Sequence, residues 1–212
     1  IYIISDVKIN DIGETKLIEI IKDLVSGSDR DSDLGHEDLV LGIGDDAAAW
    51  RPRSGIEITS TDTLVQGVHF SLSYSSWYDV GWKAMATNLS DIAAMGGVPL
   101  YALINAGLPS DIHVDDVKEL YRGMLSISDK YEVRIIGGDL VKSDVSFITI
   151  VIIGKSDQNL LLRSEMAPGD VIAVTGSLGS SAAGLRILSG DFSSRSEAHK
   201  SIIQAHLRPY PR

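Results

Sequence analysis

Residues 78–108 read YDVGWKAMATNLSDIAAMGGVPLYALINAGL, and this stretch contains both kinds of element that decide the fold. Its first part, residues 78–95, is rich in alanine and has no glycine or proline after Gly81, which is typical of a largely buried helix. Glycines and a proline at residues 96–99 then end the helix. The apolar run 99–108 has the length of a strand. A helix that leads directly into a strand predicts an α/β fold.

The flanking sequence repeats these patterns on both sides. Apolar residues at helical spacing predict amphipathic helices at residues 13–25 and 114–130. Residues 26–38 contain Gly, Ser, Asp and Arg without any period, so they predict a loop. Short apolar or alternating runs predict further strands, at residues 39–43, 47–50, 56–61, 133–136 and 145–153.

A change in composition divides the chain near residues 155–159, where the sequence turns polar. Residues 160–190 then begin a new pattern of strand, Gly-rich turn and helix. We therefore predict two domains, residues 1–155 with a mixed sheet and helices on one face, and residues 156–212 as the start of a second α/β unit. Since even a 60-residue domain buries only a marginal core, the second domain is expected to be truncated.

Composition restricts the class of protein. The 212 residues are 44% hydrophobic, enough for a core, and the formal net charge is −10, which argues against nucleic acid as a partner. The absence of cysteine excludes disulfides and thiolate metal sites, and it agrees with a cytoplasmic location. No apolar run approaches the roughly 20 residues that span a bilayer, and no leader pattern is recognisable, so we expect a soluble protein without a membrane partner.

Aspartates recur at the ends of predicted elements, with small or apolar neighbours in place of basic ones. Taken singly, each is most simply a turn or cap residue. Together they indicate more, because two carboxylates about 5 Å apart repel by roughly 3 kcal/mol at an effective dielectric constant of about 20. A cluster therefore predicts bound Mg²⁺, which typically lies between carboxylates and substrate phosphates. The four stretches are GIGDDA (42–47), STDT (60–63), NLSD (88–91) and GGD (137–139).

The glycines leave the mode of nucleotide binding open. Gly42-x-Gly44-x-x-Ala47 matches a relaxed dinucleotide fingerprint, but two acidic residues in that turn would repel a bare pyrophosphate. The chain has no P-loop motif, so a nucleotide would bind through metal and backbone amides. The turns at 137–139 and 176–181 could supply such amides, although an isolated Gly-rich turn is more often structural.

Two cationic or polar side chains are further candidates. His69 follows Asp62 closely and precedes an aromatic residue, which favours substrate contact over a role as general base. Arg163 is one of few cations available to an acidic site, and a phosphate contact is reasonable. Considered alone, each is more often a surface or packing residue.

The motifs in combination resemble the thiamine-monophosphate kinase family. They are GIGDDAA, STDTLVQGVHF, WKAMATNLSDIAAMGGVP, GGDL, LLRSEMAPGDVIAVTGSLGSSAAGL and HLRP, in this order, from about residue 13 to the end. GDD, NLSD and GGD are shared with the wider superfamily of aminoimidazole-ribonucleotide synthetase, selenophosphate synthetase and a hydrogenase maturation factor. The string TDTLVxGVHF favours the kinase, as does the lack of the N-terminal Cys or selenocysteine of the selenium enzyme.

The resemblance implies a reaction and a set of site residues. ATP would donate its γ-phosphoryl group to thiamine monophosphate, giving thiamine diphosphate and ADP without a covalent catalytic residue. His69 would contact thiamine monophosphate, and Asp46 belongs to the GDD motif without an assigned role. The ATP contacts would be Gly138, Asp139, Arg163 and Tyr121. The oxygen ligands of several Mg²⁺ ions would be Asp45, Ser60, Thr61, Asp62, Asp91 and Asp139.

The resemblance also implies an assembly. Residues 1–155 would be the metal- and ATP-binding domain, and two copies would pair their sheets into a barrel-like homodimer. Residues 156–212 would begin a ferredoxin-like α/β sandwich. Gln66 stands where the family usually has Glu, and the family continues past Arg212 with a Ser-Asp-Gly motif, so residues 1–212 alone are expected to turn over poorly. The alternatives are another acceptor within the superfamily, or a non-catalytic module that binds Mg-nucleotide or dimerises.

Asp62→Asn provides a test of the metal assignment. We expect thiamine diphosphate formation to fall by orders of magnitude, because one metal ligand loses its charge. Thermal stability without metal should stay the same or rise, since repulsion between carboxylates is relieved. Wild-type activity in this variant would show that Asp62 is not a metal ligand.

Overall fold

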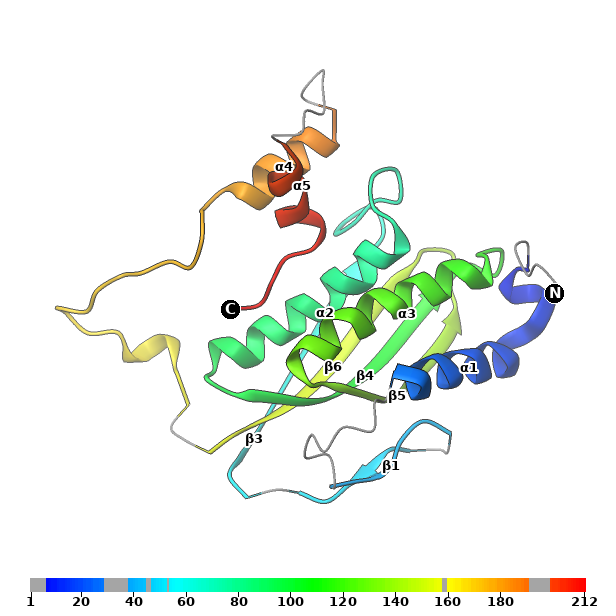
Figure 1. The fold of residues 1–212 in the computed structure, drawn as a ribbon, viewed down its shortest axis with the longest axis horizontal. Helices are drawn as coiled ribbons and strands as arrows, with labels where there is room; N and C mark the ends of the chain where they lie inside the picture. The colour runs from blue at the N-terminus through cyan, green and yellow to red at the C-terminus, as the bar shows by residue number, and fades with distance from the viewer. Residues whose placement is uncertain (1–6, 29–37, 45–46, 53, 158–159, 191–198) are drawn as a thin grey trace.

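A four-stranded mixed sheet forms the centre of the fold (Figure 1). The computed structural model describes residues 7–28, 38–44, 47–52, 54–157, 160–190 and 199–212. The strand order is β3-β6-β4-β5; β4 and β5 are parallel, and the other neighbours are antiparallel. The strands are β3 (Ile56–Val65), β4 (Val98–Leu108), β5 (Arg134–Lys142) and β6 (Phe147–Ser156).

Helices α2 (Trp77–Ala94) and α3 (Val114–Ser128) cover one face of the sheet (Figure 1). The alternation of β6 explains this burial, since Ile148, Ile150 and Ile152 all point to the helices and are 0% exposed. Helix α1 (Ile9–Ser28) packs on α3 and β5. The predicted α/β class is confirmed. No helix of the described ranges is long and apolar enough to cross a membrane.

Helix α2 begins and ends where local chemistry requires. Ser76 and Asp79 form a reciprocal capping box at its start, and Gly96, with φ +69°, follows its end. Arg208 from the C-terminal segment also pairs with Asp79. Burial acts to raise the pKa of Asp79, but the hydrogen bonds from Ser76 and Arg208 outweigh it, so that pKa lies below its ordinary value.

Two glycines allow α2 and α3 to cross closely. A Cβ atom on Gly123 would lie 2.0 Å from the carbonyl oxygen of Tyr78, and one on Gly81 would lie 1.9 Å from the carbonyl oxygen of Leu120. These neighbours are backbone atoms, which cannot rotate away as a flexible side chain would. The crossing therefore excludes any larger residue at Gly81 and Gly123.

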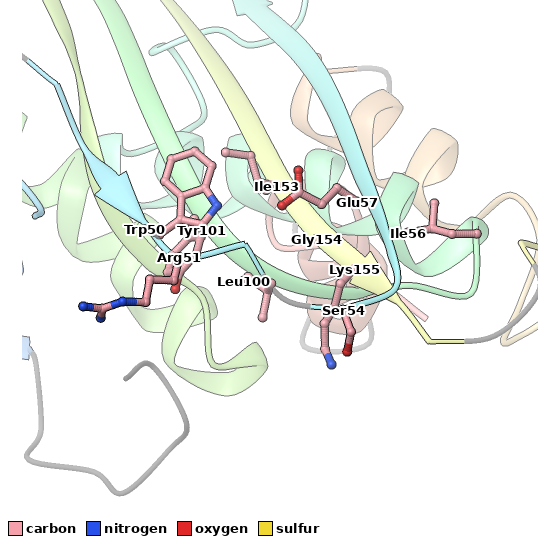
Figure 2. A pocket seen from close by; sticks show the side chains of 10 residues that line it. All are labelled: Trp50, Arg51, Ser54, Ile56, Glu57, Leu100, Tyr101, Ile153, Gly154 and Lys155. Carbon is pink, nitrogen blue, oxygen red and sulfur yellow. The ribbon is translucent and has the colours of Figure 1, made fainter. Parts of the chain in front are cut away.

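A small hairpin packs on the other face of the sheet. Strand β1 (Leu39–Leu41) pairs with β2 (Ala49–Trp50), and residues 42–48 connect the two strands. Trp50 lies over Tyr101 of β4, with ring centroids 5.6 Å apart, as Figure 2 shows. Tyr101 neighbours Ala102, which points to the helices, so alternation places Trp50 on the face away from α2.

The C-terminal residues fold back onto α2 and the end of α3. Helices α4 (Ser180–Leu188) and α5 (Lys200–Leu207) pack on each other, and α5 also contacts α2. The indole N–H of Trp82 donates to the Pro209 carbonyl at 2.8 Å. The hydroxyl of Tyr131, in the 3₁₀ turn η1 (Asp129–Tyr131) that follows α3, donates to the Pro211 carbonyl at 2.8 Å. Residues 208–211 thus connect the segment after α5 to α2 and to the turn after α3.

Two expectations need correction, and three remain untested. GGD was expected in a turn after a strand at 133–136, but β5 continues through it to Lys142 because it pairs with β4 along its length. A strand was also expected after residue 160. Residues 160–179, all of which the structure describes, contain the 3₁₀ turn η2 (Arg163–Glu165) and no strand, because a strand needs a neighbour to pair with. The domain boundary, the dimeric barrel and the ferredoxin-like unit stay predictions.

Gly123→Ala should destabilise the fold although alanine favours helices, because the methyl group collides with backbone. We expect a loss of about 1–3 kcal/mol in the free energy of unfolding, measured with denaturant. Gly27→Ala is the matched control, since Gly27 lies in α1 with open space around it. Equal stability of the two variants would contradict the close crossing.

Candidate functional site

Polar contacts join β3 to α2. The Ser60 hydroxyl donates to the Asp91 carboxylate at 2.6 Å, and the Asp62 backbone N–H donates to Asn88 Oδ1 at 3.1 Å. Ser60 and Asp62 point toward α2, because side chains two apart share one face of a strand. Thr61 points to the opposite face and is exposed. The structure therefore brings Ser60, Asp62 and Asp91 together and leaves the Thr61 side chain apart.

A cavity of about 430 Å³ opens beside these residues. Arg163 lines it together with Ser60 and Asp91, although 72 residues separate Arg163 from Asp91 in the sequence. A hydrogen bond from the Leu161 N–H to the Met95 carbonyl, at 3.2 Å, holds that segment against the end of α2. One wall is acidic and another carries a guanidinium group. Such a cavity suits a metal-bound phosphate group.

His69 lies in a tight turn directly after β3. Its Nδ1 accepts a hydrogen bond from the Val65 N–H at 3.0 Å, and its ring is exposed. Gly67 makes the turn possible with φ +81°, a value that other residues adopt only with strain. Phe70 anchors the turn because it is buried and packs edge-on against Trp77. Nε2 of His69 remains available to a ligand.

The other predicted nucleotide residues lie on β5, with Gly138 and Asp139, and on α3, with Tyr121. Gly138, Asp139 and Tyr121 line a cavity of about 80 Å³ that α1 closes with Ile18 and Ile21. A Cβ atom on Gly138 would lie 1.8 Å from the Ile104 carbonyl oxygen, so only glycine fits there. Burial raises the pKa of Tyr121, and its phenol stays protonated. Most of the residues that line this cavity are apolar.

One chain does not gather all the predicted acids. β3 and β5 are the opposite edges of the sheet, and three strand spacings of about 4.8 Å separate them by roughly 14 Å. Among the described residues, no three His, Asp or Glu side chains are close enough to hold one metal ion. Asp45 and Asp46 lie outside those residues, between Gly44 and Ala47 of the hairpin turn. Asp62 and Asp91 thus form one group, and Asp139 belongs to another.

Three residues at the site were not predicted from the sequence. Asn88 is 1% exposed and joins β3 to α2. Its position in the NLSD motif was the sequence feature that could have identified it as a site residue. Leu161 and Leu162 form the apolar side of the larger cavity. Their place depends on how the chain returns to α2 after β6, which no local pattern predicts.

Comparison with known proteins agrees with this geometry. Residues 44–156 match the family model described as AIR synthase related protein, N-terminal domain. The match covers more than half of the chain. It runs from Gly44 through β6 and includes β3 and β5, which line the two cavities. The chain therefore belongs to the AIR synthase-related family.

Within this family, the chain is similar to thiamine-monophosphate kinases. It is 41% identical to that of Bacillus subtilis over 182 residues, which are 84% of this chain and 56% of the relative. The crystal structure of the Stenotrophomonas maltophilia kinase superposes with a TM-score of 0.78 at 32% identity, over 95% of this chain and 62% of that one. AaThiL complexed with AMPPCP and TMP gives a TM-score of 0.72 at 32% identity, over 97% and 62%. The resemblance expected from the motifs is confirmed, and the chain spans about three fifths of these relatives.

Asn88→Ala should weaken the join between β3 and α2. The Asp62 N–H would lose its partner while it stays shielded from water, so we expect the free energy of unfolding to fall by about 1–3 kcal/mol in denaturant titrations. Asn105→Ala is a control, because Asn105 is an exposed residue on β4. A stability equal to that of wild type would mean that water replaces the Asn88 amide.

Proposed function

We propose that this chain is the nucleotide- and metal-binding part of an enzyme that phosphorylates thiamine monophosphate with ATP. A phosphate oxygen of the acceptor attacks the γ-phosphorus, the bond from this phosphorus to the β,γ-bridging oxygen breaks, and a new P–O–P link forms. The products are thiamine diphosphate and ADP. The observation that carries the proposal is the cavity in which Ser60, Asp91 and Arg163 meet. A relative that binds AMPPCP and TMP supports it.

The donors beside this cavity fit Mg²⁺. Ser60, Asp62 and Asp91 offer only oxygen atoms, which is the ligand type that this ion prefers. We assign metal ligation to these three residues together with Asp45, Thr61 and Asp139, of which Thr61 would have to bind from the other face of β3. Bound Mg²⁺ would neutralise charge that develops on the transferring phosphoryl group. No side chain needs to form a covalent intermediate.

The remaining polar groups bind and orient the two anions. Arg163 would donate to ATP phosphate oxygens, and its planar group matches them with two parallel hydrogen bonds. The Gly138 backbone, Asp139 and the Tyr121 ring would hold the nucleotide along β5. His69 would contact thiamine monophosphate through Nε2. Positioning of this kind is the main requirement of phosphoryl transfer.

We further propose a cytoplasmic homodimer. Within one chain, roughly 14 Å separates the acids of β3 from Asp139 of β5, which is too far for shared metal ions. The sheet face opposite α2 carries partly exposed apolar side chains, among them Val151 and Ile153. Burial of this face against a second copy would remove apolar surface from water and could bring an acid of one copy near those of the other.

Arg163→Met gives the sharpest test of the nucleotide site. We expect the wild-type chain to bind AMPPCP in the presence of Mg²⁺ and the variant to bind it about ten- to a hundredfold more weakly, because a charge-assisted hydrogen bond is lost. Isothermal titration calorimetry measures both affinities. Arg122→Met is the control, since Arg122 is exposed and pairs only with Glu119 in the described structure.

Three results would contradict the proposal at separate points. Failure of the wild type to bind Mg-AMPPCP would remove the nucleotide site. Equal affinity in Arg163→Met would remove Arg163 from it. If a full-length enzyme that contains this chain binds the nucleotide but forms no thiamine diphosphate in a coupled assay, the chain belongs to a binding module or to a kinase with another acceptor.

A further inference from the structure

Lys83 is a half-buried cation on the face of α2 that turns toward β3. Its Nζ donates to the carbonyl oxygen of His69 at 3.3 Å and lies 3.5 Å from Nε2 of His206 in α5. The other nitrogen of His206 lies 3.2 Å from the Ser181 hydroxyl of α4. The ammonium group therefore joins three parts of the chain, namely α2, the turn after β3 and the C-terminal helix pair.

No carboxylate accompanies this ammonium group. The chain has 29 acidic residues against 19 basic ones, yet none in the described ranges lies within the 4.0 Å ion-pair distance of Lys83. Burial lowers the pKa of Lys83, and no anion offsets this effect. Burial and the Lys83 charge also lower the pKa of His206, whose ring is therefore neutral at pH 7. The Lys83 shift thus reflects burial alone, and the His206 shift reflects burial together with the nearby Lys83 charge.

The ammonium group has a hydrogen-bonding position to spare. Lysine has three N–H donors, of which one is used by the His69 carbonyl and a second is directed to His206. The third has no partner in the described structure. An anion there would complete the hydrogen bonding and supply the missing counter-charge.

The position of Lys83 indicates which anion. Lys83, Thr87 and Asp91 are four residues apart and share one face of α2, with Lys83 about 12 Å along the helix from Asp91. Asp91 bonds to Ser60 at the far end of this face, and Lys83 bonds to the His69 turn at the near end. The cation thus lies on the acceptor side of the proposed metal site, within reach of a phosphate held between the two ends.

We propose that Lys83 is an acceptor-binding residue whose ammonium group binds a phosphate oxygen of the phosphate ester to be phosphorylated. The inference rests on the proposed function and extends it, because Lys83 would distinguish thiamine monophosphate from thiamine. His69 and His206 hold the ammonium group in place by neutral contacts, so its charge remains for the ligand. Arg163 serves the nucleotide in the same way on the other side of the metal site.

Titration calorimetry on the 212-residue chain with Mg-AMPPCP tests this proposal. Lys83→Met should weaken the binding of thiamine monophosphate by about ten- to a hundredfold and leave that of thiamine unchanged. Lys83→Arg, which keeps the charge, should restore most of the affinity. Lys118→Met is the matched control, because it removes the same charge from an i,i+3 pair with Asp115 on α3.

The outcomes separate this inference from the function on which it rests. Wild-type affinity for thiamine monophosphate in Lys83→Met would overturn the role of Lys83 and leave the kinase proposal standing. Equal losses for thiamine monophosphate and thiamine, with a lower melting temperature, would make Lys83 a structural clamp and overturn the role too. If the wild type binds Mg-AMPPCP but not thiamine monophosphate, the acceptor is wrong. Titration with inorganic phosphate then decides: weaker binding in Lys83→Met supports the anion site, and equal or absent binding overturns it.

Discussion

The burial of α2 between the sheet and α3 is the interaction on which the rest of this structure depends. Met85, Leu89 and Ile92 are at most 1% exposed, and each contributes about 1.5–3 kcal/mol through burial. A single polar contact on the other face of the helix contributes only about 0.5–1.5 kcal/mol. The apolar side chains therefore determine how α2 is rotated about its axis. That rotation turns Lys83 and Asp91 toward β3.

The strand order is a second constraint, and it governs the electrostatics. Placing β3 and β5 at opposite edges keeps Asp62 and Asp139 apart, which lowers their repulsion from roughly 3 kcal/mol at about 5 Å to about 1 kcal/mol at about 14 Å for the same dielectric constant. At physiological salt, screening reduces the remainder further. A single chain can thus carry its acids without metal.

Two arginines that approach acids of α2 come from distant parts of the sequence. Arg163 reaches the larger cavity through the segment that follows β6, and Arg208 reaches Asp79 through the segment that follows α5. The same return of the chain brings His206 to Lys83. Residues 160–212 therefore contribute side chains to the larger cavity and to the surroundings of α2.

The sequence by itself determined the type of most elements and the family. An alanine-rich stretch without glycine or proline after Gly81, followed by a glycine stop, predicted α2 within one residue at each end, and alternation predicted β6, because both signals are local. It also placed Ser60, Asp62 and Asp91 in motifs that the structure brings together. Only the tertiary structure decided that Asp139 lies on the far edge, that GGD is part of β5, and that Lys83 meets His206. Those results depend on strand order and on contacts between residues far apart in the chain, such as the 123 positions between Lys83 and His206, and local periodicity has no information about such pairs.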